Sequence, residues 1–364
     1  MRSPFGSGQL ECRWLNRVQS PAHITSDTEK PSQSISDQGF AIESGRLMYT
    51  AWAVPAAAIV ALEYVVAVSI GFLVGFHYRI PFASYFIAAA TVVILSLAAI
   101  LSFKLVRALI VGDTPADFSR FAAFACGVFL VGLQMAVLSW LKVMLPLSVG
   151  FWADAPLAHL DSTIFQTDPW RLLGVLDPAA MFIDRAYMTW APAKFTTLII
   201  LFCLPSEARK SQALVAYFLI AACVMLGQYL LPSAGPVFYG HLGLGDRFAD
   251  MPVRPWVATT VGYLWTGYLS AGGGVGTGIS AMPSLHVAVA LWLALVIRSY
   301  LPRLQFIGWA YFAVILVGSV YLGWHYALDG IVAVMITLAC WRTAPALFWS
   351  SRGKDAWFRK AARA

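Results

Sequence analysis

Long apolar segments recur along the chain, and shorter polar segments separate them. Several apolar segments reach about 20 residues with almost no charge, the length that an α-helix needs to cross the hydrocarbon core of a bilayer. Because backbone polar groups must pair within each segment in lipid, the pattern predicts an all-α polytopic membrane protein with about eight spans. The predicted spans lie near residues 50–76, 84–103, 121–145, 186–205, 213–231, 284–300, 304–323 and 326–345.

The fourth predicted span is the least regular, because Pro192 and Lys194 interrupt it. Two further segments, 146–185 and 232–283, are too long for simple connections, and loops of this length usually carry function. Both contain aromatic residues, which predicts that they lie at the membrane interface.

The polar and apolar segments predict four parts of the chain. Residues 1–46 are polar and lack the apolar stretch of a signal peptide, so they are expected to form a disordered cytoplasmic tail. Residues 47–185 hold N-terminal spans and an outer amphipathic segment. Residues 186–345 hold a C-terminal core of five to six spans, and residues 346–364 form a basic cytoplasmic tail.

Composition and charge agree with a membrane protein and exclude a soluble domain. Hydrophobic residues make up 59% of the 364 residues and charged residues only 12%, against about a quarter in soluble domains. The net charge of +7 needs no nucleic acid as a partner, since Lys and Arg gather on cytoplasmic loops. Most of them fall on one side if both termini are cytoplasmic. This predicts a protein of the cell inner or plasma membrane, surrounded by membrane lipids, with 146–185 and 232–283 on the periplasmic or outer side.

Two of the six histidines, His286 and His325, fall at the outer ends of predicted spans and therefore at one depth. His325 and Asp329 are four residues apart at a helix start, so their side chains share one face. A carboxylate there can accept from one imidazole nitrogen and leave the other free to attack an electrophile.

The first histidine follows Pro283 and Ser284, residues that suit the first turn of a helix. Free backbone N–H groups and the helix dipole favour an anion at that position. We expect the Ser284 hydroxyl to contact a phosphate there and His286 to protonate a leaving oxygen.

These residues resemble the type 2 phosphatidic acid phosphatase superfamily, through the pair Pro283-Ser284-Leu285-His286 and His325-x-x-x-Asp329. The branch with inositol phosphorylceramide synthases and their bacterial relatives is the most similar. Its resemblance rests on the segment Gln228-Tyr229-x-x-Pro232-x-x-Gly235-Pro236 and on the His-Tyr-x-x-Asp form of the second motif. The resemblance covers about residues 185–345, which it identifies as a phosphatase- or phosphotransferase-like core.

The resemblance implies a reaction and roles for four residues. His325 would be the nucleophile that forms a phospho-histidine, Asp329 would orient it, His286 would be the general acid, and Ser284 would contact phosphate. No metal and no cofactor would take part. The substrate would be a lipid phosphoester and the acceptor either water or an alcohol such as inositol, so hydrolysis and transfer both stay open. Gly235 and Pro236 would shape the phosphate pocket or simply turn the chain.

The chain departs from the superfamily in its phosphate-binding cations. A Ser-Arg pair expected before the second histidine is replaced by Gly318 and Ser319. Arg247-x6-Arg254-Pro255 has the spacing of the superfamily motif that begins with Lys. One supplied cation can accelerate phosphoryl transfer by orders of magnitude, so another basic residue is expected to bind the phosphate. Arg247 is the first candidate for this role, followed by Arg254 and Arg185.

Other interpretations of these features are open. The chain could be a non-catalytic transporter or lipid-binding scaffold, or the two histidines could ligate a haem. The segment 272–278 is expected to be a lid or hinge rather than a phosphate cradle. Glu63, within the first span, is expected to have an inward-facing structural partner. Five aspartates are interpreted as a solvated outer face rather than a metal site: Asp154, Asp161, Asp168, Asp177 and Asp184.

Overall fold

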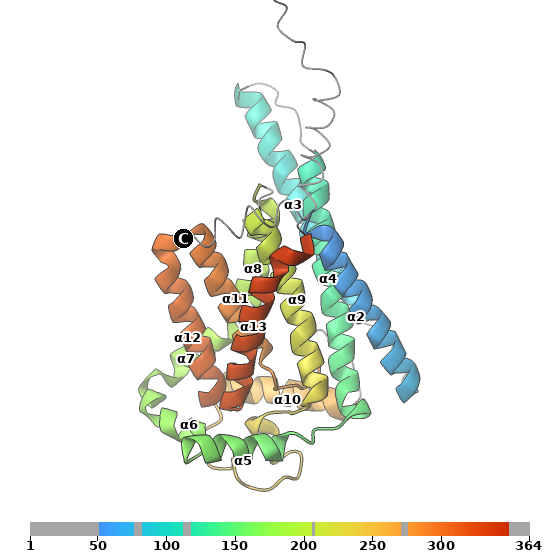
Figure 1. The fold of residues 1–364 in the computed structure, drawn as a ribbon. Coiled ribbons are helices and arrows are strands. Elements are labelled where there is room, and N and C mark those ends of the chain that lie inside the picture. The colour runs from blue at the N-terminus through green and yellow to red at the C-terminus, as the bar shows by residue number, and fades with distance from the viewer. Residues whose placement is uncertain (1–50, 76–81, 112–117, 206–207, 271–275, 349–364) are drawn as a thin grey trace, which may run out of the picture. The chain divides into compact units, whose positions relative to one another are not determined.

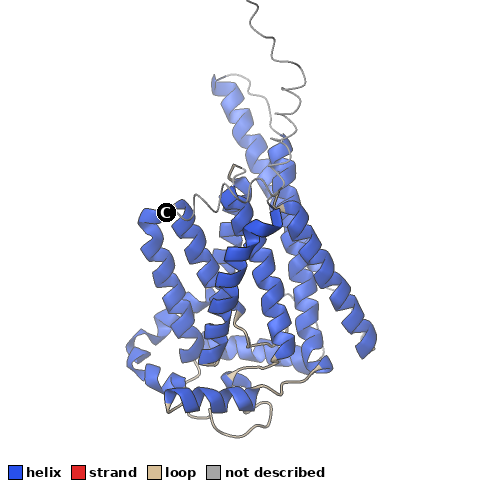
Figure 2. Cartoon of the chain, viewed as in Figure 1, coloured by secondary structure: helices blue, strands red, loops and turns tan. Residues whose placement is uncertain are grey.

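The computed structural model describes residues 51–75, 82–111, 118–205, 208–270 and 276–348. All regular secondary structure in these ranges is helical (Figure 2), which confirms the predicted all-α membrane fold. The predicted tails, 1–46 and most of 346–364, lie outside the described residues, as does most of the glycine-rich segment 272–278.

Each of the eight predicted spans coincides with a helix, and Figure 1 shows their arrangement. In chain order they are α2 (Ala53–Val74), α3 (Phe82–Val111), α4 (Phe118–Ser148), α8 (Trp190–Cys203), α9 (Ala208–Leu230), α11 (Leu285–Tyr300), α12 (Gln305–Tyr321) and α13 (Ala327–Phe348).

Fewer than eight helices of the described residues are long and apolar enough to cross a membrane. Six meet this condition, and a seventh span arises if α8 is joined to the helical segment before it, from which it is bent by 42°. The remaining helix, α11, has only 16 residues. It begins at Leu285 because Pro283 lacks a backbone N–H and the Ser284 hydroxyl accepts from the Val287 backbone N–H at 3.3 Å, which caps the helix.

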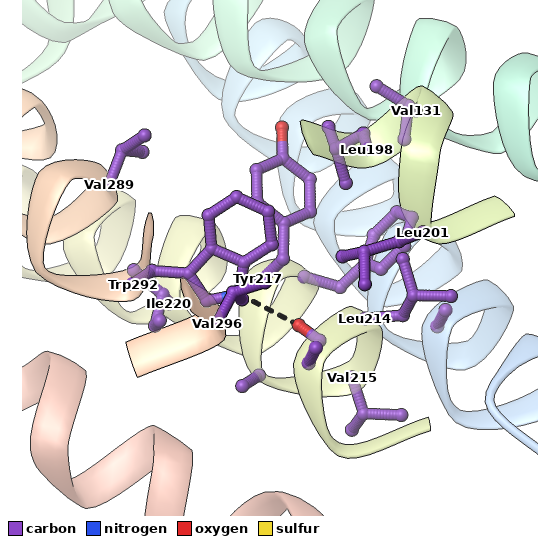
Figure 3. Close-up of a cluster of buried hydrophobic side chains, with 14 of the residues drawn as sticks. Val131, Leu198, Leu201, Leu214, Val215, Tyr217, Ile220, Val289, Trp292 and Val296 are labelled. Atoms are coloured by element: carbon purple, nitrogen blue, oxygen red, sulfur yellow. Dashed lines mark hydrogen bonds between the residues drawn. The ribbon is translucent and has the colours of Figure 1, made fainter. Parts of the chain in front are cut away.

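The core of the bundle forms where α9 and α11 pack together and against their neighbours. Residues 287–296 of α11 are all buried, so this helix is surrounded by protein rather than by lipid. The indole nitrogen of Trp292 donates to the Ala213 carbonyl of α9 at 2.8 Å. Figure 3 draws a hydrogen bond from Trp292 as a dashed line. This buried bond fixes the depth of α11 against α9 and therefore the position of its N-terminus.

The N-terminal helices pack on this core through α4, which contacts α2, α3, α8 and α9. Glu63 of α2 is buried and accepts from the Gln134 side-chain amide of α4 at 3.2 Å. The predicted inward-facing partner of Glu63 is thus present. Large apolar side chains on the other faces of α2 and α3 are exposed, as expected for helices in contact with lipid.

Short helices cross the ends of the long ones at the predicted outer side (Figure 1). They are α5 (Asp154–Phe165), α6 (Pro169–Leu172), α7 (Ala180–Met188) and α10 (Pro255–Leu269), with 3-10 turns at Leu173–Ala179 and Pro236–Phe238. Contacts join α5 to α13, α6 to α12 and α7 to α10. The two long outer segments are therefore folded against the helix ends that carry the histidines.

Candidate active site

A chain of three side chains joins the starts of α11 and α13. The Nδ1 atom of His325 lies 3.2 Å from an Asp329 oxygen, and its Nε2 atom lies 3.4 Å from Nδ1 of His286. His325 precedes the first turn of α13, yet the predicted contact four residues ahead is made. The Asp329 oxygen is positioned to accept the Nδ1–H of His325, an arrangement that leaves the lone pair on Nε2. Both ring nitrogens of His325 are therefore in hydrogen-bond contact. The two histidine rings meet directly and are not held apart around a haem iron.

The surroundings of His325 keep its imidazole neutral. The side chain is only 3% exposed, and burial lowers its pKa from 6.5 to about 3, with a further contribution from the positive charge of Lys142. A neutral imidazole is the form that can act as a nucleophile.

Ser284 connects the two helix starts. Its hydroxyl caps α11, its backbone N–H donates to the Asp329 carbonyl at 3.2 Å, and the Gln228 amide donates to the neighbouring Pro283 carbonyl at 3.2 Å. The Ser284 side chain is fully buried and does not line the cavity beside the histidines. In this structure the Ser284 hydroxyl therefore contacts the start of α11 and not the cavity.

Gly235 and Pro236 support the loop that holds His325. Gly235 has a φ of 100°, and a Cβ atom there would collide with the Trp324 carbonyl. The adjacent Val237 N–H donates to the Gly323 carbonyl at 2.9 Å. The two loops can pack this closely only because position 235 is glycine.

Two aspartates of α5 fix these loops through backbone N–H groups. Asp154 accepts from Ala234 and Gly235 at 2.8 Å each, and Asp161 accepts from Ala327 at 2.6 Å and Leu328 at 3.2 Å. Burial raises the pKa of both carboxyl groups, and these N–H donors lower it in part. The expected solvated face is therefore wrong: both side chains are buried, because they satisfy the free N–H groups of the loop and of the α13 start.

The other three aspartates are also engaged. Asp184 is buried and accepts from the Trp256 N–H at the start of α10 at 3.1 Å. Asp168 pairs with Arg247 at 2.7 Å and Asp177 with Arg254 at 2.8 Å.

These ion pairs occupy the arginines that the spacing indicated as phosphate ligands. Arg247 also donates to the Ala158 carbonyl at 2.8 Å, and Arg254 donates to the Tyr321 hydroxyl at 2.7 Å. Neither arginine lines the cavity beside the histidines, nor does Arg185. Ser319, in the place of the expected arginine, is buried and donates to the Leu316 carbonyl at 2.7 Å.

The cavity beside the histidines has a volume of about 340 Å³. Its lining is mainly apolar and aromatic and comes from α3, α4, α7, α8, α10 and α11 together with the loop before α13. Lys142 of α4 and Lys194 of α8 line it with both histidines, and the described lining contains no carboxylate. The described residues include no cluster of His, Cys, Asp or Glu that could hold a metal ion.

Sequence reasoning missed these lysines as parts of the site. Each was visible as a basic residue in or beside an apolar span, where a charge is costly and usually functional. The segment 255–269 was also missed as a helix, although Pro255 is a common first residue of helices.

Comparison with known proteins finds one family. Residues 167–343 match the model of the PAP2 superfamily. No curated protein and no solved structure matches the chain. The match includes both histidines, Asp329 and Lys194, and excludes Lys142 and α5. It supports the PAP2 superfamily for the segment that carries the histidine pair, and with it a phosphatase or phosphotransferase type of activity.

Proposed function

We propose that this protein is an integral membrane enzyme that cleaves or transfers a lipid phosphoester through a phospho-histidine intermediate. The observation that carries the proposal is the His286–His325–Asp329 chain at the wall of a mainly apolar cavity. An apolar cavity of this kind suits acyl chains beside a phosphate group. The PAP2 match supports the reaction class.

In the first step, the Nε2 lone pair of His325 attacks phosphorus. The P–N bond forms as the bond to the leaving alcohol breaks, and the electron pair stays on the leaving oxygen, which takes a proton from the imidazolium form of His286. Phosphorus must approach along the direction in which His286 now lies at 3.4 Å, so substrate replaces the contact between the two rings. Asp329 stabilises the positive imidazolium that bears the phosphoryl group.

In the second step, an acceptor oxygen attacks phosphorus and gives its proton to His286. The P–N bond breaks and neutral His325 is restored. From a phosphomonoester substrate, water as the acceptor gives free phosphate and an alcohol gives a new phosphomonoester. From a phosphodiester substrate, water gives a phosphomonoester and an alcohol gives a new phosphodiester. The motif around Gln228 and Gly235 favours transfer to an alcohol such as inositol.

Other predicted site residues act through this geometry. Ser284, Gly235 and Pro236 fix the two helix starts around the phosphate, and Arg247 and Arg254 hold the outer helices through Asp168 and Asp177. The distribution of Lys and Arg supports cytoplasmic termini and a site at the outer face of the inner or plasma membrane.

A labelling experiment tests the proposal. Purified protein in detergent micelles is given ³²P-labelled phosphatidic acid, and bound label is assayed for the acid lability and base stability of phospho-histidine. We expect His325→Ala to lose the label and to lower turnover by about 10⁴-fold or more. His159→Ala, an exposed histidine on α5, is the matched control and should retain both.

The same assay separates acceptors and the alternative function. Free phosphate and labelled inositol monophosphate are quantified with and without inositol. Unchanged turnover in His325→Ala would reject the histidine mechanism. Absence of turnover in the wild-type protein across a panel of lipid phosphates would favour a lipid-binding scaffold or transporter.

A further inference from the structure

Lys194 has an environment that is unusual for a charged side chain. It is 2% exposed, and its ammonium group lies 4.7 Å from the centre of the Trp190 ring and 4.3 Å from that of Phe195. Among the described residues, its one hydrogen-bond contact is the Met135 sulfur at 3.4 Å, a weak acceptor. A buried ammonium group without a carboxylate is strongly unfavourable, which indicates that an anion completes this environment when the cavity is filled.

Lys142 brings a second positive charge to the same cavity. It is half-buried on α4, and no hydrogen bond or ion pair joins its ammonium group to another described residue. Its charge acts on Lys194 and on both histidines. Two cations that repel each other in a mainly apolar cavity create a strong preference for an anionic ligand.

The position of Lys142 is fixed by a close backbone contact. Gly278 packs directly on the backbone of α4 at Lys142, with a φ of 104°, and a Cβ atom there would collide with it. Gly278 precedes the helix that carries His286 by a few residues. The contact therefore joins α4 to the start of α11 and holds Lys142 beside the histidines.

Two hydroxyl groups of the lining add unused hydrogen-bonding capacity. The Ser280 and Tyr187 hydroxyl groups are buried without a hydrogen-bond partner among the described residues, and both residues line the cavity. The Tyr187 ring stacks on His286 with 5.0 Å between ring centres. Ammonium groups and hydroxyl groups are donors that phosphoryl oxygens accept.

We propose that Lys142 and Lys194 bind the phosphoryl oxygens of the anionic substrate beside His325 and supply the positive charge that position 319 lacks. The inference rests on the proposed function and assigns its phosphate-binding site. Because Lys142 lies outside residues 167–343, α4 is part of the active site and not an accessory to the matched segment. The ligand class is a phosphomonoester or phosphodiester anion.

Binding of inorganic phosphate tests the inference without requiring turnover. The probe is the phosphate-dependent rise in melting temperature of the full-length protein in detergent, measured in His325→Ala so that no phosphoenzyme forms. We expect Lys142→Met and Lys194→Met each to weaken phosphate binding by about 10- to 100-fold. Lys142→Arg and Lys194→Arg should retain most of the affinity, whereas Lys104→Met, on the distant part of α3, should have no effect.

The sign of the stability change distinguishes a binding role from a structural one. Removal of an unpaired buried charge should raise the melting temperature of the phosphate-free protein in Lys194→Met, while the phosphate-dependent rise is lost. Phosphatidic acid should raise the melting temperature as phosphate does, and diacylglycerol should not. Undiminished phosphate affinity in Lys142→Gln and Lys194→Gln would overturn the inference. Loss of phosphate binding in the lysine variants, together with no trapped phospho-histidine in the wild-type protein, would support phosphate binding by the two lysines and reject the proposed function.

Discussion

The buried groups beside His325 differ between the α5 side and the cavity side. Toward α5 they are acidic, and Asp154 and Asp161 each receive two backbone N–H groups. Toward the cavity they are basic, and Lys194 meets only a sulfur atom and two ring faces. Both arrangements remove charge from water, but only the acidic one provides partners within the protein.

This difference separates residues that build the site from residues that await a ligand. A buried carboxylate with donors around it is part of the folded structure, and its loss is felt as lost stability. A buried ammonium group without an acceptor weakens the empty protein and is retained for what it binds. The comparison therefore predicts opposite effects on stability for substitutions on the two sides.

The largest expected effect comes from Asp329, the one acidic group that contacts the reacting imidazole. Asp329→Asn should reduce turnover by about 10³- to 10⁴-fold, because an amide can hold the wrong tautomer of His325. The rate of phosphoenzyme formation measures this loss directly. A variant that folds and forms the phosphoenzyme at the wild-type rate would place Asp329 with the structural aspartates.

The next largest expected effect concerns the rate of phosphoenzyme formation at acid pH. Burial and the charge of Lys142 lower the pKa of His325 to about 3, so its nucleophilic form should persist at pH 5. An imidazole with a pKa of 6.5 would lose about 30-fold in reactive form at that pH. Rapid-quench measurement of phosphoenzyme formation at pH 5 and pH 7 checks this, and a 30-fold fall would contradict it.

The same pKa has a consequence for stability. Between pH 6.5 and about 3 the unfolded chain binds a proton at His325 that the folded protein does not, so this residue makes the fold less stable as the pH falls. His325→Gln should remove this part of the acid dependence of the melting temperature.

Loss of a structural aspartate should have a moderate effect. Asp161→Ala leaves the Ala327 and Leu328 N–H groups without an acceptor and should cost about 1–3 kcal/mol of stability. Turnover should fall because the start of α13 loosens beside His325, whereas phosphate affinity should change less than in the lysine variants. Thermal unfolding in detergent measures the first effect, and a rise in melting temperature would contradict the comparison.

The smallest expected effects concern the outer arginines. Arg247→Gln removes a partly buried pair with Asp168 and should cost about 1–2 kcal/mol, while Arg171→Gln removes an exposed pair with Asp250 and should change stability by about 0–1 kcal/mol. Phosphate affinity should stay unchanged in both. A tenfold loss of phosphate affinity in Arg247→Gln would restore the ligand role that its spacing suggests.

The sequence carried the parts of the fold and site that depend on local pattern. Apolar length predicted every long helix, and the spacing of His325 and Asp329 predicted their contact. The partners of Asp154 and Asp161 could not be predicted from the sequence. These aspartates bind backbone N–H groups, which every residue type except proline has. Arg247 and Arg254 matched a motif in spacing, yet aspartates from another segment occupy them. Lys142 joins the site only through tertiary packing, and no motif near His286 points to it.

The position of Lys142 beside the histidines, held by the contact between Gly278 and α4, has a consequence for the order in which the site is synthesised. Lys142 and His325 are separated by 183 positions along the chain (325 − 142), so the ribosome completes one half of the site long before the other. The lining of the cavity is complete only when the loop with Trp324 and His325 has joined the helices made first. A chain that stops before His325 contains both lysines but lacks the proposed nucleophile, and cannot hold phosphorus on that histidine.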